Sequence, residues 1–244
     1  MRESRTLIEP TRGEEEPLIG PDAIMVSMPS VLRVMADLSH AEKKALRIMS
    51  PFEFFFVKRS HTSPLALAGP LLGAPQAVIV LEKLIALGAK KLLVLGWCGS
   101  LQPDLMIGDL IIPTTALSEE GTSAHYPMNK KRRQTNSLLN ARLGNALGKT
   151  NLPFTTGPVW TTDAIYRETE KKVAAYMKRG FLAVEMEMSA LITVALYRCV
   201  ELAGLLVVSD DLSSLKWHTG FGGDTLKKRS KEACKVLLDL CMNG

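Results

Sequence analysis

The stretch PQAVIVLEKLIALGAKKLLVLGWCG, residues 75–99, decides the fold class of this chain. Pro75 suits the first turn of a helix, and Gly88 suits the position just after a helix ends. Between them, apolar side chains recur at helical spacing and form one stripe: Ala77, Val78, Leu81, Leu84 and Ile85. Residues 91–95 then predict a buried strand. A buried helix that leads into a buried strand indicates a layered α/β protein.

The same alternation of short apolar runs and helical segments continues along the chain. We expect strands at residues 23–28, 52–58, 65–69, 91–95, 109–118, 154–161, 182–185 and 205–209. A second helix is predicted around residues 138–147, a third over 188–203, stopped by Gly204, and a fourth over 226–240. This order of elements places the chain in the α/β class.

Length and composition favour one large folded unit. The chain has 244 residues, 46% of them hydrophobic and 23% charged, which is enough to bury a deep core. Residues 1–20 carry charges of both signs and two prolines, Pro10 and Pro17, so residues 1–21 predict an extended arm before the first strand. No repeat or linker interrupts residues 22–244, so we expect a single domain there.

Charge and cysteine content exclude several classes of protein. The formal charge of +5, from 30 basic and 25 acidic residues, is too small to predict a nucleic-acid groove. Four cysteines without a C-x-x-C pair predict neither a zinc site nor a disulfide framework, and His125 and His218 lack metal-ligand partners, so no metal is expected. The charged N-terminus does not resemble a secretory signal, and prolines and glycines break the uncharged stretch 61–81. We expect a cytoplasmic protein with no nucleic-acid or membrane partner.

Three segments place small or acidic residues where predicted strands end. LLVLGWCG, residues 92–99, leads into a glycine turn, AVEMEMSA, residues 183–190, carries Glu185 and Glu187, and LLVVSDDL, residues 205–212, carries Ser209 and Asp210. Ligands of α/β sheets bind at such strand ends. The alternative is structural, because acidic residues also cap helices and complement the helix dipole. Each segment alone leaves both interpretations open.

Taken together, the order and spacing of these motifs resemble the nucleoside phosphorylase and nucleosidase family, in the branch of purine nucleoside and uridine phosphorylases. The resemblance covers about residues 65–240. It rests on Gly73-Ala74-Pro75, Gly96 to Gly99, Ile107-Gly108-Asp109, Glu119 to Ser123 with Tyr126, Thr162-Asp163 with Tyr166, Val184 to Glu187 and Val208 to Asp210. It implies a three-layer αβα sandwich around a mixed, partly barrel-like sheet, and a homo-oligomer that is a dimer or a trimer of dimers.

The resemblance also implies cleavage of the N-glycosidic bond of a nucleoside, with phosphate as co-substrate and no cofactor. In that reaction Glu187 would accept hydrogen bonds from the ribose hydroxyls, with Met186 packed on the sugar and Glu185 beside it. Asp210 would protonate or hydrogen-bond the leaving base. The base contacts would come from Ile165, Tyr166, Ser209 and Trp97. A purine is favoured because Asp210 is present and the uracil-reading residues of uridine phosphorylases are absent.

The chain departs from the family pattern at the phosphate site. Phosphorolytic relatives carry a glycine-aspartate-proline-x-arginine loop where this chain has Ser27-Met28-Pro29-Ser30-Val31, and a second arginine where it has Val94. Guanidinium groups suit phosphate because they donate paired, always-charged hydrogen bonds. Gly96 and Trp97 remain phosphate-binding candidates by position, and Arg33 or Arg167 would replace the missing cations. Alternatively, Trp97 fills the vacated anion pocket or is a core aromatic residue.

Three functional hypotheses therefore remain. The first is a nucleoside phosphorylase, a pentosyltransferase of purine salvage that transfers the ribosyl group to phosphate. The second is a nucleoside hydrolase that uses water because the arginines are absent. The third is a nucleoside- or nucleotide-binding protein without turnover.

Overall fold

The computed structural model describes residues 6–46, 52–60, 62–128 and 133–242. Within these residues, ten strands form one sheet in the order β10-β9-β6-β7-β8-β5-β1-β4-β3-β2, and β9 also pairs with β5. That extra pairing closes β5, β8, β7, β6 and β9 into a ring, and β1, β4, β3 and β2 extend from it as an open wing. The strands are β1 (Asp22–Val26), β2 (Glu42–Lys44), β3 (Glu53–Arg59), β4 (Thr62–Gly69), β5 (Lys91–Ser100), β6 (Leu110–Glu119), β7 (Phe154–Thr162), β8 (Ala183–Glu185), β9 (Glu201–Asp211) and β10 (His218–Thr219).

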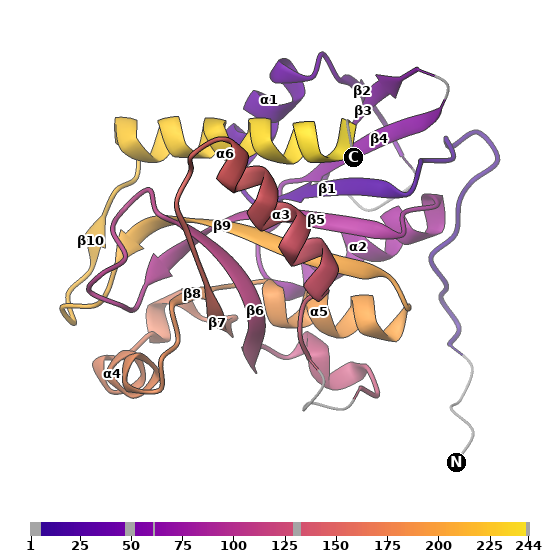
Figure 1. Cartoon of the computed structure of the whole chain (residues 1–244). Coiled ribbons are helices and arrows are strands. Elements are labelled where there is room, and N and C mark those ends of the chain that lie inside the picture. Colours follow the sequence, from indigo (N-terminus) through magenta and orange to yellow (C-terminus); the bar gives the residue numbers. More distant parts are fainter. Residues whose placement is uncertain (1–5, 47–51, 61, 129–132, 243–244) are drawn as a thin grey trace.

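Helices cover both faces of this sheet (Figure 1). Leu92 and Val94 of β5 face the core under α2 (Ala74–Leu87) and α5 (Met188–Tyr197), whereas Leu93 and Leu95 face the opposite core. The second core lies under α1 (Pro29–Leu38), α3 (Ser137–Lys149) and α6 (Asp224–Met242). Because strand side chains alternate between faces, a continuous apolar run such as that of β5 needs a helical layer on each side. The predicted three-layer arrangement is confirmed.

The segment that decides the fold class forms as predicted. Helix α2 has Pro75 in its first turn, and it ends at Gly88, whose φ of 121° an L side chain rarely adopts. The strand that follows, β5, extends to Ser100, five residues beyond its predicted end. It pairs with β1, β8 and β9, so it forms the centre of the sheet.

The predicted helix over residues 188–203 is wrong in its second half. Helix α5 ends at Tyr197, Cys199 turns the chain with a φ of 56°, and β9 begins at Glu201. Residues 188–208 are almost uniformly apolar, and a buried helix and a buried strand both produce such a run. Sequence analysis also assigned no structure to α1, α4 (Glu170–Lys178), the short strands β2 and β10, or the helical turns η1 (Thr122–His125) and η3 (Ile165–Arg167).

Residues 6–21 contain no helix or strand, but they are fastened to the folded unit. Lys83 of α2 contacts Glu16 at 2.6 Å, and both side chains are buried. The Lys83 ammonium also donates to the carbonyl oxygen of Thr11. Residues 1–5 of the predicted arm lie outside the described residues. No helix in the described part of the chain is both long and apolar enough to cross a membrane.

The close contact between β4 and β1 gives a stability prediction. A Cβ atom on Gly69 would lie 2.2 Å from the carbonyl oxygen of Val26, so Gly69→Ala forces two paired strands apart. We expect it to lower the free energy of unfolding by about 3 kcal/mol. The matched control is Gly148→Ala in α3, where a Cβ meets nothing within 4 Å. That change should raise stability by up to about 1 kcal/mol, because alanine favours helices. Urea denaturation measures both, and equal effects of the two substitutions would contradict the prediction.

Candidate active site

A cavity of about 430 Å³ opens where the end of β8 meets the C-terminal parts of β5 and β9. The turn between β1 and α1, the segment before α2, the turn η3 and the loop after β9 complete its walls. The lining residues are Ser27, Met28, Leu71, Leu72, Trp97, Cys98, Gly99, Ile165, Tyr166, Glu168, Val184, Glu185, Met186, Glu187, Ser209, Asp210, Leu212, Trp217 and Phe221. The structure thus brings together most of the residues that the sequence singled out.

Glu185 is the last residue of β8, and it organises the start of α5. One carboxylate oxygen accepts the backbone N–H groups of Glu187 and Met188, each at 2.7 Å. The other accepts a short hydrogen bond from the hydroxyl of Thr161, on the neighbouring strand β7. Glu185 therefore acts as a helix cap, which is the structural alternative that the sequence left open, while it also lines the cavity.

Glu187 is the second buried carboxyl group of the cavity. Its Oε1 accepts the backbone N–H of Gly73 at 2.7 Å, which ties the segment before α2 to the end of β8. Burial raises the pKa of Glu187 above its ordinary value of 4.5, and the charge of Glu185 adds to that shift. Burial also raises the pKa of Glu185, although hydrogen bonds from Thr161 and two backbone N–H groups oppose it. Since Glu185 receives more donors, a proton shared by the pair resides on Glu187.

Asp210 faces these two residues from β9. The ladder between β5 and β9 slips by one residue, so that Cys98 pairs with Val208 and Gly99 pairs with Asp210. A bulge of this kind re-aims a side chain. A Cβ on Gly99 would lie 3.0 Å from Asp210 Oδ2 and 2.6 Å from Leu212 Cδ1, so glycine makes room for the carboxylate.

Both oxygens of Asp210 accept hydrogen bonds within the chain. Ser209 donates its hydroxyl to Oδ1 at 2.6 Å, and Trp217, on the loop after β9, donates its indole N–H to Oδ2 at 2.9 Å. Trp217 is 58% exposed and packs edge-on against Phe221. The two donors fix the direction in which Asp210 points into the cavity.

The turn η3 and the residue after it form the outer wall of the cavity. Ile165 is 45% exposed and Tyr166 is 93% exposed, so both side chains are accessible from the solvent. Glu168 follows the turn and is half-buried. Burial and the charge of Asp210 together raise the pKa of Glu168 to about 7. Asp163 fixes the junction between β7 and η3, because its carboxylate accepts the backbone N–H of Gly121 at 2.9 Å.

Trp97 lines the cavity, and contacts with α6 and Phe221 hold its ring in place. Its indole N–H donates to the hydroxyl of Ser230 on α6 at 3.0 Å, and its ring stacks on Phe221 with centroids 6.0 Å apart. One face of the indole therefore belongs to an aromatic cluster of Trp97, Phe221 and Trp217. Of the alternatives that the sequence left open for Trp97, the interpretation as a purely internal core residue does not fit this position.

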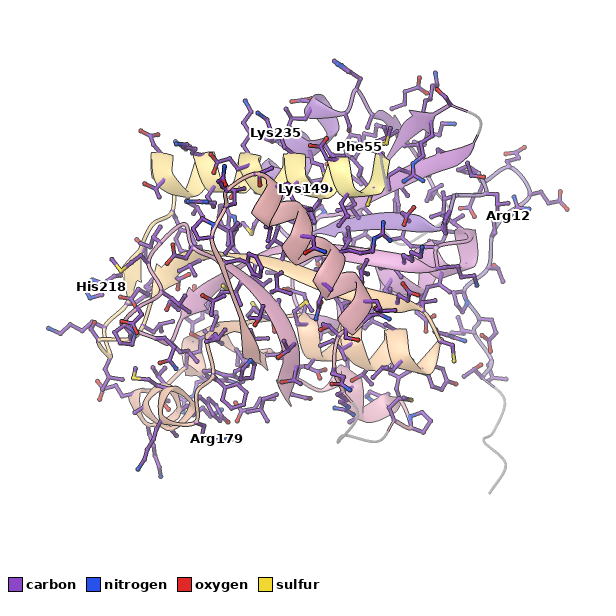
Figure 2. The ribbon with its side chains drawn as sticks, viewed as in Figure 1. Arg12, Phe55, Lys149, Arg179, His218 and Lys235 are labelled. Carbon is purple, nitrogen blue, oxygen red and sulfur yellow. The ribbon has the colours of Figure 1, made fainter. Side chains whose placement is uncertain are left out.

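The residues considered for phosphate binding are less well placed. Gly96 is buried in β5, and neither it nor Arg33 or Arg167 is among the residues that line the cavity. Arg33 and Arg167 are both exposed. The described lining contains no arginine, lysine or histidine. Figure 2 shows basic side chains on the outer surface instead, among them Lys149, Arg179 and Lys235, which are all exposed.

The start of helix α1 lies next to the cavity wall. Helix α1 starts at Pro29 with no side-chain cap and no acidic residue in its first turn. Ser27 and Met28, which precede it, line the cavity. The free N–H groups and the positive end of the helix dipole at such a terminus attract anions.

Sequence analysis assigned no role to Glu168, Trp217 or Phe221, nor did it link Gly73 to Glu187. Glu168 stands beside Ile165 and Tyr166 in the sequence, and that proximity was the available signal. The contact between Trp217 and Asp210 depends on the path of the loop after β9, which no local pattern encodes. The described His, Cys, Asp and Glu residues contain no group of three that could hold a metal ion.

Known proteins share the family signature and the fold of this chain. The family model of the phosphorylase superfamily matches residues 21–241. The chain is similar to a guanosine phosphorylase of Halorubrum lacusprofundi, with 26% identity over 79% of this chain and 80% of the relative. It is also similar to a DeoD-type purine nucleoside phosphorylase of Bacillus cereus, with 32% identity over 72% of this chain and 73% of the relative.

Solved structures share the fold. Uridine phosphorylase from Vibrio fischeri ES114 superimposes with a TM-score of 0.82 and 20% identity, over 99% of this chain and 100% of the other. Purine nucleoside phosphorylase from Toxoplasma gondii, in complex with immucillin-H, gives a TM-score of 0.82 and 21% identity over 98% of each chain. The closed mixed sheet between helical layers is common to these proteins.

The buried carboxyl pair predicts how stability depends on pH. A carboxyl group with a raised pKa binds its proton more tightly in the folded state, so its contribution is complete at low pH and is lost as the pH rises through the folded pKa. We expect the free energy of unfolding to fall between about pH 5 and pH 8 because Glu185 and Glu187 must then ionise while buried. Glu187→Gln should remove the part of this decline that Glu187 contributes, whereas the part due to Glu185, whose pKa is raised mainly by its own burial, should remain.

Urea denaturation at several pH values measures that decline. The matched control is Glu42→Gln on the exposed strand β2, because its pKa is lowered by Lys58 and it does not titrate in this range. A decline of equal steepness in Glu187→Gln and in the unaltered protein would contradict the proposed origin of the pH dependence.

Proposed function

Because the chain belongs to the phosphorylase superfamily, we propose that it cleaves a purine nucleoside by phosphorolysis and transfers the ribosyl group to inorganic phosphate. The observation that carries this proposal is the cavity itself. It places Met186 and Glu187 on one wall and Asp210 on another, around a volume of about 430 Å³ that accommodates a nucleoside. The relatives named as guanosine and purine nucleoside phosphorylases support the purine assignment.

The sugar would lie against the end of β8. Glu187 is positioned to bind the ribose hydroxyls, with Met186 packed on the apolar face of the ring and Glu185 holding the start of α5 behind it. As the bond between base and sugar breaks, positive charge develops on the sugar ring. The ionised member of the Glu185 and Glu187 pair stabilises that charge most effectively in a site that excludes water.

The base would lie between the aromatic cluster and the outer wall of Ile165 and Tyr166. The ring of Trp97 offers a stacking face, and the Asp210 carboxylate offers a hydrogen-bond acceptor whose direction Ser209 and Trp217 fix. Holding the base edge in this way orients the base for cleavage of its bond to the sugar.

Phosphate would lie beside the start of α1, next to Ser27 and the sugar. The uncapped N–H groups of that helix replace part of what the missing arginines supply. The resemblance implies a homo-oligomer, and its neighbouring subunit would bring further donors to the opening of this cavity. The described lining of a single chain has no arginine or lysine, and this is the observation that favours the alternative of hydrolysis by water.

The requirement for phosphate separates these alternatives. We expect base release from guanosine or inosine only when phosphate is present, with ribose 1-phosphate as the second product. Because guanidinium donors are missing from the described cavity wall, the KM for phosphate should lie at or above about 1 mM, the upper end of the usual range for substrates. Release of free ribose without phosphate would establish hydrolysis instead. Absence of base release under both conditions, together with nucleoside binding in calorimetry, would establish a binding protein.

Asp210 is expected to act directly on the base. Asp210→Asn keeps the shape of the side chain but removes its charge, so kcat with guanosine should fall by roughly 10² to 10⁴-fold. Asp211→Asn is the matched control, because Asp211 is the next residue of β9 and does not line the cavity. Its kcat should stay close to that of the unaltered protein. Steady-state assays of base release compare the two variants, and similar rates for both would argue against a role for Asp210.

A further inference from the structure

Glu168 places a carboxyl group in the cavity wall without a described hydrogen bond that would account for it there. Its side chain lines the cavity together with Asp210, and in the described part of the chain no group hydrogen-bonds to its carboxyl oxygens. The other carboxyl groups of the cavity differ in this respect. Glu185 accepts three hydrogen bonds, Glu187 accepts the N–H of Gly73, and Asp210 accepts two.

The position of Glu168 matches the place where the base would lie. It follows Ile165 and Tyr166 on the outer wall and lines the same cavity as Asp210, whose charge acts on it. The titratable groups that face the same space are Cys98 from β5, Tyr166 from η3, Glu185 and Glu187 from the end of β8, and Asp210 from β9. Among the described residues that line the cavity none is cationic, and no positive charge is among the causes that act on the pKa of Glu168.

From this juxtaposition we propose that Glu168 is a second catalytic acid, which delivers a proton to the purine as the base leaves. The inference rests on the proposed function and adds to it a residue and a step. Asp210 holds the base edge, and its two oxygens are already engaged by the donors of Ser209 and Trp217. Glu168 has no such donors, and burial beside Asp210 raises its pKa to about 7, so it carries a proton at neutral pH.

The bond between C1′ of the ribose and N9 of the purine breaks, and its electron pair moves into the imidazole ring of the base. The proton of the Glu168 carboxyl group moves to N7, so that the base leaves as a neutral molecule. A phosphate oxygen forms the new bond to C1′. Formation of that bond releases the proton of the attacking phosphate hydroxyl to the solvent, and the Glu168 carboxylate takes up a proton in exchange, because its half-buried side chain is open to solvent.

A substrate that needs no proton tests this role. In 7-methylguanosine the N7 atom already carries a methyl group and a positive charge, so its base leaves without an acid. We expect Glu168→Gln to lower kcat with guanosine about 100-fold at pH 6.5 and to change kcat with 7-methylguanosine less than about 3-fold. Glu170→Gln, two residues along at the start of α4 and outside the cavity, is the matched control and should leave both rates unchanged.

The pH profile gives a second readout that a structural role would not change. The unaltered protein should lose activity on guanosine as the pH rises above about 7, because the acid form of Glu168 disappears. The pH profile of Glu168→Gln should lack this loss of activity. Phosphate ionises equally in both assays, so the difference between the two profiles does not include its effect. Equal losses on both nucleosides, or no loss on guanosine, would overturn the inference while leaving the proposed function intact. Absence of base release by the unaltered protein would overturn both.

Discussion

The pairing of β5 with three neighbours is the constraint on which the rest of the structure depends. β1, β8 and β9 all hydrogen-bond to it, and the ladder with β9 both closes the ring and slips by one residue at Gly99. That slip turns Asp210 toward the cavity, and the pairing of Gly99 with Val184 sets the end of β8 beside it. Backbone hydrogen bonds of β5 therefore bring Asp210 close to the carboxyl groups at the end of β8, although the two segments are separated in the sequence.

The sequence predicted the regular parts of this arrangement because they repeat a local pattern. The apolar stripe of α2 and the strand after it needed only side-chain periodicity and a glycine stop. The boundary between α5 and β9 was missed because the run through it is apolar on both sides, and only the ladder between β5 and β9 decides where the helix ends. The candidate site shows the same contrast between local and long-range information. Glu187 and Asp210 stand in recognisable motifs and were predictable, whereas Trp217 reaches Asp210 across a loop and was not.

The electrostatics of the cavity follow from what surrounds each carboxyl group. Glu185 is surrounded by donors that also cap α5, so its charge serves the fold as well as the site. Glu187 and Glu168 have fewer donors or none, and burial favours their protonated forms. A cavity whose described lining holds acids but no arginine or lysine suits a sugar that becomes positive during the reaction. The same lining offers phosphate no cation, so under the proposed function the uncapped start of α1 would supply donors to the anion.

Helix α2 connects this site to the N-terminal segment. Gly73, just before the helix, donates its N–H to Glu187, whereas Lys83 in the third turn holds Glu16 in a buried ion pair. Removing one partner of a buried ion pair leaves an uncompensated charge, so the N-terminal segment and α2 are held together strongly. The same helix therefore has two attachments, one at its start to a carboxyl group of the site and one in its third turn to the residues before the first strand.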